Sequence, residues 1–501
     1  MFNDSLKSRR KKLDALSGTR TYDLLVIGGG IVGAGIVRDA ALRGLRTALV
    51  DQHDFAFGTS SRSSRLLHGG IRYLAQGRVR LVREASVEKT ILHRIAPHLA
   101  EPLPFIFPAY RQFSDWPFWQ LRIGVKIYDL LCGGQNLGRS TSLDKNRLAT
   151  EVPQLLRTGL KGAVRYFDGF TQDARLVLDT LRSAESAGAT LLNYVRFEKS
   201  ENSSSGFTAH LHDRESNRAF TVRARCMVNA TGPWSEEIPG SKVHLRLTKG
   251  IHLVFPRELL PVKEAVVITE KNRVLFVLPW GERVIIGTTD TDYAGSPEKV
   301  RSNREDVQYL LRTVATFFPG VNLSEDRIIS SWSGLRPLIA DPRKGPSDIS
   351  RSHQIRQSHP GWWDVAGGKL TTYRLIAEQT VDQVTHHLAP LSFEPCKTAE
   401  LPLLPPEQTG GISQVIPPSF CKSLVEHFCH NEWALHLTDI MMRRSSWHFY
   451  EGEQGDHARQ CATWMAELLG WSNETLELEL LEYRRASEGH LIPKSAGGLA
   501  T

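Results

Sequence analysis

The chain has 501 residues, of which 41% are hydrophobic and 23% are charged, and its formal net charge at pH 7 is +8. The length predicts two or three domains, and the composition is that of a soluble globular protein with no apolar run near the ~20 residues that a membrane-spanning helix needs. The positive charge favours an anionic partner, which leaves nucleic acid, an anionic membrane surface and an anionic small substrate open.

The N-terminal segment, residues 1–21, is basic and lacks the apolar core of a secretory signal. Asp4 and Asp14 argue against a transit peptide, so we predict a frayed basic tail. The six cysteines are scattered along a long chain. This usage is typical of reduced thiols in the cytoplasm.

A dinucleotide-binding unit is predicted next, in YDLLVIGGGIVGAGIVRDAALRGLRTALVDQ. An apolar strand over 24–27 leads into a G-x-G-x-x-G turn and a helix, and a second strand over 46–50 ends at an acidic residue. The first glycine allows the tight turn, the second lets the backbone approach a pyrophosphate, and the third lets the helix pack on the strand. The acidic residue is placed to accept hydrogen bonds from a ribose. These residues are Gly28, Gly30, Gly33 and Asp51.

An arginine-rich stretch with a Gly-Gly pair follows, SSRLLHGGIRYLAQGRVRLVREAS, over residues 63–86. A solvated helix would not need the glycines and a packed core would not tolerate the arginines, so we expect an anion at this stretch. Its second half is expected to be a helix that presents Arg78, Arg80 and Arg83 to solvent.

Two later segments repeat the pattern of a buried strand that runs into a glycine turn: CMVNATGPW at 226–234 and WWDVAGGKLTTYRLIAEQTVDQV at 362–384. Together with the first unit they predict one nucleotide-binding domain assembled from separated segments. Nicotinamide-binding folds tend to be contiguous, so this arrangement favours FAD as the cofactor.

The remaining segments predict a sheet and a group of helices. VVITEKNRVLFVLPWGERVIIGTTDTDY, from Val266, alternates strand-like runs with turns and predicts an antiparallel meander whose last strand ends at Asp290. DARLVLDTLRSAESAG, from Asp173, has the pattern of an amphipathic helix. After a Pro/Gly-rich connector near residue 395, helical stretches predict a small C-terminal domain.

The predicted fold class is α/β: a Rossmann-like FAD-binding domain built from discontinuous segments, an inserted antiparallel-sheet substrate domain and a C-terminal α-helical domain. The expected boundaries are 1–21 for the basic tail, 22–90, 155–240 and 330–395 for the FAD-binding domain, 91–154 and 241–329 for the substrate domain, and 396–501 for the C-terminal domain.

Taken in order, the motifs between about residues 22 and 385 resemble the FAD-dependent glycerol-3-phosphate dehydrogenases, membrane-associated flavoproteins of bacteria and mitochondria. They include IGGGIVGAGIVRDAALRG, TSSRSSRLLHGGIRYL, VNATGPW, TKGIHLVFP, VLPWGERVIIGTTDTDY, SGLRPL and GGKLTTYR. The resemblance implies oxidation of sn-glycerol 3-phosphate to dihydroxyacetone phosphate, with hydride transfer to FAD. It further implies electron delivery to a membrane quinone, at the cytoplasmic face of the inner membrane.

The resemblance also implies site residues. His252 is expected to be the base or proton relay, and Arg336, which is too basic to accept a proton, is expected to stabilise the developing oxyanion. The residues expected around the substrate are His68, Arg72, Tyr73, Arg351 and Lys369, with the phosphate near Arg72, Tyr73 and Lys369. The expected cofactor contacts are Gly28, Gly30, Gly33, Asp51, Ser60, Ser61, Gly69, Gly70, Thr231, Gly232, Gly368, Lys369, Leu370 and Thr371.

An anionic lipid surface is an expected partner. The segment FPAYRQFSDWPFWQLRIGVKIYDLL places four aromatic side chains next to three cations: Phe113, Trp116, Phe118 and Trp119 beside Arg111, Arg122 and Lys126. Aromatic rings next to cations are typical of a membrane interface. A buried aromatic cluster within the substrate domain is the alternative interpretation.

Other functions stay open at this point. They are an amine or amino-acid oxidase on the same flavin scaffold, a glycerol-3-phosphate oxidase that uses oxygen, and a non-catalytic flavoprotein. No nucleic-acid-binding motif is present, and Cys421, His427, Cys429 and His430 do not have the spacing of a metal site. We therefore expect neither a nucleic-acid partner nor a metal, and leave a homodimer open.

Overall fold

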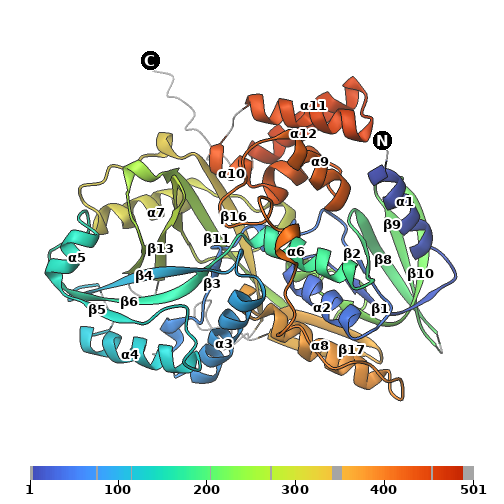
Figure 1. The fold of residues 1–501 in the computed structure, drawn as a ribbon, viewed down its shortest axis with the longest axis horizontal. Coiled ribbons are helices and arrows are strands. Elements are labelled where there is room, and N and C mark those ends of the chain that lie inside the picture. The colour runs from blue at the N-terminus through green and yellow to red at the C-terminus, as the bar shows by residue number, and fades with distance from the viewer. Residues whose placement is uncertain are drawn as a thin grey trace.

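The structure is a computed structural model that describes residues 4–74, 77–113, 116–203, 205–270, 273–340, 353–452 and 455–488. It contains two β-sheets with helices packed around them, and the helices of the C-terminal region lie together at one edge of the molecule (Figure 1). None of the helices in these ranges combines the length and the apolarity that crossing a bilayer requires.

The first sheet is the layer that the sequence predicts to bind a dinucleotide. Its path is β17–β18–β10–β1–β2–β7, with β9 paired to β10 and β8 to β9. Strands β7, β2, β1, β10 and β18 pair in parallel, whereas β9 and β17 are antiparallel to their neighbours. The strands are β1 (Thr21–Ile27), β2 (Thr47–Val50), β7 (Thr190–Leu192), β8 (Val195–Ser203), β9 (Gly206–Asp213), β10 (Arg218–Asn229), β17 (His353–His359) and β18 (Trp362–Gly367).

The central strands of this sheet are apolar runs because both of their faces are covered. Leu24 and Val26 of β1 belong to the core that includes α2 (Ile31–Leu42), α6 (Asp173–Ser186) and α8 (Tyr373–His387). Leu25 and Ile27 belong to the core on the opposite face. The strands come from three stretches of chain, which confirms the predicted Rossmann-like unit assembled from discontinuous segments.

The second sheet follows the path β15–β11–β14–β13–β12–β4–β6–β3, with β16 paired to β11 and β5 to β6. The consecutive strands β12, β13 and β14 form the predicted antiparallel meander, although β14 ends at Gly287 and not at Asp290. The strands are β3 (Leu66–Leu67), β4 (Glu101–Tyr110), β5 (Thr141–Leu143), β6 (Leu160–Phe170), β11 (Leu245–Pro256), β12 (Ala265–Glu270), β13 (Arg273–Trp280), β14 (Arg283–Gly287), β15 (Thr291–Tyr293) and β16 (Ser330–Ile339).

Sheet membership and the predicted domain boundaries differ at three strands. β3, β6 and β16 fall in ranges expected for the FAD-binding domain, but all three pair within the second sheet. A short apolar run shows that a strand forms, but not which strand it will pair with. The domain boundaries expected from the sequence stay a prediction.

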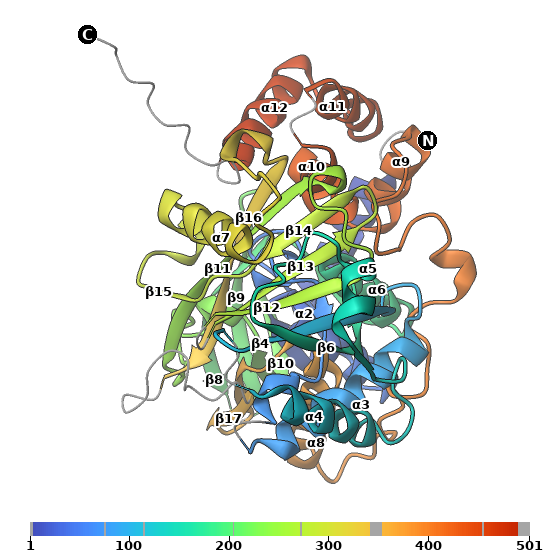
Figure 2. The ribbon, with the colours of Figure 1, turned by 90° about the vertical axis from the view of Figure 1, so that its left-hand side faces the viewer.

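Four helices pack around the second sheet: α3 (Val79–Ile95), α4 (Phe118–Leu131), α5 (Lys145–Glu151) and α7 (Arg304–Phe317). Figure 2 shows α3 and α4 together below the sheet and α7 at its upper edge. The side chains of Arg80 and Arg83 on α3 are exposed, as predicted, whereas Arg78, the N-cap residue of this helix, is half-buried.

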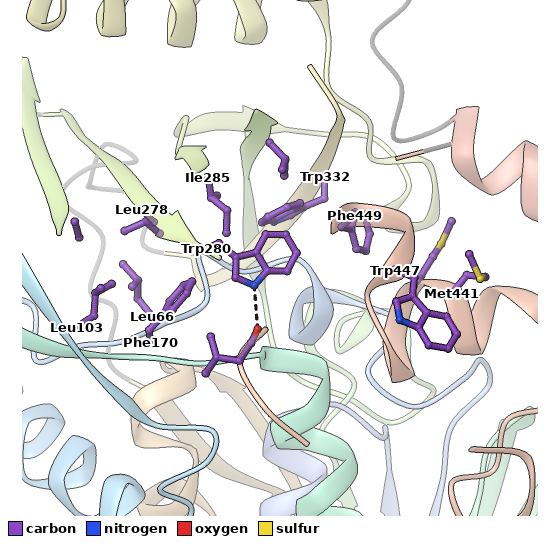
Figure 3. Close-up of a cluster of buried hydrophobic side chains, with 14 of the residues drawn as sticks. Leu66, Leu103, Phe170, Leu278, Trp280, Ile285, Trp332, Met441, Trp447 and Phe449 are labelled. Atoms are coloured by element: carbon purple, nitrogen blue, oxygen red, sulfur yellow. Dashed lines mark hydrogen bonds between the residues drawn. The ribbon is translucent and has the colours of Figure 1, made fainter. Parts of the chain in front are cut away.

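The C-terminal region is helical, as predicted. It comprises α9 (Lys422–Asn431), a π-helical turn over Asp439–Arg444, α10 (Trp447–Glu451), α11 (Gly455–Leu469) and α12 (Asn473–Glu488). Its side chains share one hydrophobic core with the second sheet, where Trp280 and Trp332 approach Phe449 (Figure 3). The indole N–H of Trp280 donates to the carbonyl oxygen of Val415 at 2.9 Å. The C-terminal helices are thus part of the same packed body.

The prediction of a frayed basic tail at the N-terminus is wrong. Residues Asp4–Leu16 form α1, and Leu13 and Leu16 are buried against the first sheet. Arg9 and Lys12 form ion pairs with Asp213 and Glu185. This segment is ordered by apolar residues at helical spacing and by carboxylates from a distant strand and a distant helix. Neither carboxylate could be identified as a partner from the local sequence.

The helix α6 differs from its predicted amphipathic character, because every residue from Asp173 to Ala184 is buried. Its polar face is covered by the C-terminal region. Arg175 donates to both carboxylate oxygens of Glu432, and it also pairs with Asp179 one turn along the helix. The pattern of polar residues that looked solvent-facing in the sequence is a buried ion-pair interface in the fold.

Candidate active site

The turn between β1 and α2 has room only for glycine at two positions. Gly28 has a φ of +108°, and a Cβ atom there would lie 2.6 Å from the carbonyl oxygen of Ala230. A Cβ atom on Gly33 would lie 1.9 Å from the carbonyl oxygen of Gly28. The N-cap residue of α2, Gly30, has no capping side chain, and the first turn of the helix contains no acidic residue. The positive end of the helix dipole therefore faces the turn and favours an anion there.

Two side chains complete this turn. Asp51, just past β2, accepts the N–H of Gly29 at 2.6 Å and the N–H of His53 at 2.8 Å. Burial raises the pKa of the Asp51 carboxyl to about 7, against the lowering effect of these two N–H groups. Ser60 Oγ accepts the N–H of Ile31, the first residue of α2, at 3.0 Å.

A cavity of about 540 Å³ lies at the carboxyl ends of the parallel strands and extends to the second sheet. This is the edge at which open α/β sheets bind ligands. The predicted site residues on its wall are Gly28, Gly30, Asp51, Ser60, His68, Gly70, Arg72, Thr231, Gly232, His252, Arg336, Gly368, Lys369, Leu370 and Thr371. The cavity thus brings together residues that are far apart in the sequence.

Four predicted residues are not on this wall, namely Gly33, Ser61, Gly69 and Tyr73, and Arg351 lies outside the described residues. Gly69 donates its N–H to the hydroxyl of Tyr128 at 2.8 Å, and a Cβ atom there would lie 2.5 Å from that oxygen. Its missing side chain thus makes room for α4. Tyr73 is buried and supports the two cations described below.

The residues present fit FAD. The glycine cradle would be filled by any Cβ atom, the helix N-terminus lacks a capping side chain, and a buried carboxyl group stands where a ribose is expected. Glycine turns from all three segments of the first sheet line the same cavity. Gly28, Gly30 and the α2 N-terminus would hold the pyrophosphate, and Asp51 would hold the ribose.

His252 lies on β11, buried, at the part of the cavity wall formed by the second sheet. Its Nε2 lies 2.8 Å from Ser64 Oγ, and its ring stacks on Trp332 with 5.1 Å between the ring centres. Burial, followed by the charges of Arg336 and Arg65, lowers the pKa of His252 to about 3. The imidazole is therefore neutral at pH 7.

Arg336 reaches the cavity from β16, the neighbour of β11. Its guanidinium group donates to the carbonyl oxygen of Thr289 at 3.2 Å, to Asp290 at 3.2 Å and to Thr288 Oγ1 at 3.1 Å. The register of the two strands places Thr248 opposite Arg336 and His252 opposite Trp332. The two predicted catalytic residues therefore lie on adjacent strands, four positions apart in register.

The cations expected to bind phosphate are held by one aromatic ring. The Arg72 guanidinium lies 5.0 Å and Lys369 Nζ 4.5 Å from the ring centre of Tyr73, and Arg72 also donates to the Tyr73 hydroxyl at 3.0 Å. Arg72 and Lys369 both line the cavity. His68, on the same wall, donates its backbone N–H to Thr371 Oγ1 at 2.9 Å.

Sequence reasoning missed the support behind His252. Arg65 is fully buried between Trp280 and Trp332, with its Cζ 4.2 Å and 4.9 Å from the ring centres. It also missed Ser64, although the SSRSSR run contains both residues. Their role depends on β16 and on the meander, which only the tertiary structure brings to this loop.

A second missed cluster lies under the Gly69 loop. Asp168, on the cavity wall, accepts from Lys89 Nζ at 2.9 Å and from the Tyr128 hydroxyl at 2.5 Å. Burial raises the pKa of Asp168, against the lowering effect of Lys89. Because Tyr128 also binds Gly69, the buried pair of Lys89 and Asp168 fixes the backbone of this loop.

The chain is similar in sequence to known flavoproteins. The sequence profile described as DAO, FAD dependent oxidoreductase, matches residues 23–383. The aerobic glycerol-3-phosphate dehydrogenase of Bacillus subtilis (strain 168) is 39% identical over 398 residues, which cover 77% of this chain and 71% of that protein. The enzyme of the same name from Staphylococcus aureus (strain MRSA252) is 37% identical over 395 residues, covering 76% of this chain and 70% of that protein.

Solved structures show the same relationship. The glycerol-3-phosphate dehydrogenase from Bacillus halodurans, complexed with FAD, matches with a TM-score of 0.78 and 28% identity over 97% of this chain and 98% of that one. A glycine oxidase from Geobacillus kaustophilus shares the fold at a TM-score of 0.57 and 22% identity, over 75% of this chain and 97% of that one. The cofactor of the matched family is FAD. The chain belongs to the FAD-dependent oxidoreductase family and, within it, to the FAD-dependent glycerol-3-phosphate dehydrogenases.

Proposed function

We propose that this chain oxidises sn-glycerol 3-phosphate to dihydroxyacetone phosphate and delivers the electrons to a membrane quinone. The observation that carries this proposal is one cavity wall that presents Arg72 and Lys369 together with His252 and Arg336. A phosphorylated secondary alcohol needs both pairs: cations for the dianionic phosphate and a base for the hydroxyl proton. The names of the relatives support the same substrate.

The reaction divides between the cofactor and the side chains. FAD, when bound, supplies the acceptor for the hydride that leaves carbon 2 of the alcohol. His252 accepts the hydroxyl proton at Nε2, the nitrogen that faces Ser64 on the cavity wall. Arg336 stabilises the negative charge that develops on the oxygen as the carbonyl forms. Arg72 and Lys369 bind the phosphate and orient the substrate.

The proposed substrate is tested by adding it anaerobically to the purified holoenzyme. We expect glycerol 3-phosphate to bleach the flavin absorption bands, and glycerol to leave them unchanged because it lacks the phosphate. Bleaching by amines or amino acids instead would favour the oxidase alternative and contradict the proposal. Reoxidation by a soluble quinone analogue should outpace reoxidation by air. The reverse order would indicate a glycerol-3-phosphate oxidase.

We assign membrane contact to the outer face of α4. The side chains of Trp119, Ile123, Ile127 and Leu130 are 59%, 52%, 43% and 76% exposed, and they recur at helical spacing. They form one apolar stripe on a helix that lies at the edge of the molecule (Figures 1 and 2). Arg122 and Lys126, exposed on the same helix, suit an anionic lipid surface. We therefore propose peripheral attachment to the cytoplasmic face of the inner membrane.

The aromatic residues before α4 divide between the two interpretations made from the sequence. Phe113, Trp116 and Phe118 pack against buried cores, whereas Trp119 points outward. Trp116 also lines the apolar side of the cavity, which includes Phe105, Phe107, Tyr166 and Phe276. This apolar side therefore adjoins the helix proposed to contact lipid. Its position supports a quinone that reaches the cofactor from the membrane.

Lipid binding by α4 is tested with the double variant Ile123→Ser/Leu130→Ser. Each replacement removes an apolar side chain whose burial is worth about 1.5–3 kcal/mol, so binding to vesicles that contain anionic phospholipid should weaken at least on the order of 100-fold. Co-sedimentation with the vesicles measures this binding. The matched control is Leu478→Ser/Leu481→Ser on α12, a pair of leucines outside the stripe that are 54% and 42% exposed. Equal sedimentation of both double variants and the wild type would refute the assignment.

A further inference from the structure

The loop that follows β2 has two sides. Over Asp51–Phe57, which we name the β2 loop, Asp51, Gln52, His53 and Phe57 line the cavity. Asp54 and Phe55 lie on the other side of the loop and are fully buried. One short segment thus carries the predicted ribose acceptor on one side and an interior contact on the other.

Asp54 is held by two consecutive arginines of the C-terminal region. Arg443 Nε donates to its carboxylate at 2.5 Å, and Arg444 donates to both carboxylate oxygens, one of them at 2.8 Å. Asn193 adds a further hydrogen bond at 3.0 Å. Burial would raise the pKa of Asp54, but the charges of Arg444 and Arg443 lower it to about 2. Asp54 is therefore ionised and fully paired in the interior.

The arginines are themselves fixed by the C-terminal region. Arg443 donates to Asp439 at 2.7 Å within the π-helical turn, and Arg444 donates to the carbonyl oxygen of Glu432 at 2.7 Å. Two carboxylates thus face two guanidinium groups, so the buried charges balance. A π-helical turn is an uncommon geometry that often occurs at functional sites. Here it directs two neighbouring side chains at one carboxylate.

Phe55 makes a second contact between the C-terminal region and the cofactor turn. Its ring meets that of Trp433 edge to face, with 5.2 Å between the centres. On its other side, a Cβ atom on Gly29 would lie 2.4 Å from the Phe55 ring. Ala56 donates its N–H to the carbonyl oxygen of Gly29 at 3.0 Å. The β2 loop is therefore packed between Trp433 and the glycine turn.

From these contacts we propose that Arg443 and Arg444 are positioning residues for FAD. By holding Asp54 they keep the β2 loop, and Asp51 with it, in the shape that receives the cofactor. The matched family region ends at residue 383, so these arginines lie outside it. The C-terminal helices act as a cofactor-retaining element of the enzyme. The proposal concerns FAD alone and does not depend on the identity of the substrate.

The test measures FAD release from the holoenzyme of Asp54→Asn and Arg443→Met. Each variant removes a hydrogen bond between charged groups, so release, followed as the rise in FAD fluorescence after dilution, should be about 10- to 100-fold faster than in the wild type. The matched control is Arg175→Met. Arg175 is equally buried and paired with Glu432 at the same interface. It reaches the arginine pair only at the backbone, through the carbonyl oxygen of Arg444 at 3.5 Å, and it does not contact the β2 loop. Its FAD release should stay near the wild-type rate.

A second readout separates positioning from general destabilisation. Hydrogen exchange of the backbone amides of residues 51–57 should accelerate in Asp54→Asn but not in Arg175→Met, even where both variants unfold at similarly lowered temperatures. Arg443→Lys, which keeps the charge, should restore slow release in part. If Arg443→Met does not fold, Asp54→Asn carries the test, because asparagine keeps the size of the side chain. Equal FAD release from Asp54→Asn, Arg175→Met and the wild type would overturn the proposal.

Discussion

His252→Ala is expected to slow anaerobic flavin reduction by glycerol 3-phosphate by about 10²- to 10⁴-fold, the usual contribution of a positioned general base. The imidazole is on the cavity wall, 2.8 Å from Ser64, and its pKa, lowered to about 3 mainly by burial, keeps it neutral at working pH. Without it the proposed acceptor of the hydroxyl proton is missing. Stopped-flow absorbance at saturating substrate measures the effect, and binding of FAD should be unchanged.

His448→Ala is the matched control for that experiment. His448 is also a buried histidine, and burial lowers its pKa to about 4. Its Nδ1 lies 3.0 Å from the hydroxyl oxygen of Tyr483 in the C-terminal region. Both substitutions remove a buried ring and should reduce thermal stability by a similar amount. Only the His252 variant should lose flavin reduction. Near-normal reduction in His252→Ala would show that another group takes the proton.

Gly33→Ala is expected to abolish stable FAD binding. The new methyl group would lie 1.9 Å from the carbonyl oxygen of Gly28, and that neighbour is backbone, so the phosphate-binding turn itself must move. Overpacking of this kind costs about 1–3 kcal/mol or more, and here it falls on the turn that receives the pyrophosphate. The FAD content of the purified variant and the fluorescence titration of its apoprotein measure the loss.

The control for the glycine experiment is Gly124→Ala on α4. A Cβ atom at Gly124 would have no atom within 4 Å outside its own helix backbone. Alanine is favoured over glycine inside helices by roughly 0.5–1 kcal/mol, so this variant should keep its FAD and unfold at the same or a slightly higher temperature. A Gly33→Ala protein that retains FAD as firmly as Gly124→Ala would contradict the steric argument.

Local chemistry explains why parts of the fold were predictable. In the turn after β1, Gly28 has a φ of +108° and Gly33 lies directly against the Gly28 carbonyl group, so the spacing of the glycines indicates the turn directly. The meander of β12, β13 and β14 is marked by turns between apolar runs that pair with their neighbours in the chain. Both features depend on contacts that are close in sequence.

Other features depend on partners that are distant in sequence. The polar face of α6 has the pattern of a solvent-exposed surface, yet Arg175 on this face pairs with the buried Glu432. The basic segment of α1 has the composition of a disordered tail, yet ion pairs with Asp213 and Glu185 order it. The buried pair of Lys89 and Asp168 and the stack of Arg65 on Trp332 have no local signal. In each case a charge is held by a partner more than 70 residues away.

The sequence by itself determined the cofactor class and the family, and most of the site residues that it predicts lie on the cavity wall, because phosphate cradles and cationic motifs are short and sterically demanding. Only the tertiary structure decided which residues support them. It set His252 against Trp332, separated the outward-facing Trp119 from the half-buried Trp116, and placed Arg443 and Arg444 against the β2 loop. The physical reason is that burial and ion pairing are properties of the whole packed chain, whereas turn geometry belongs to a few consecutive residues.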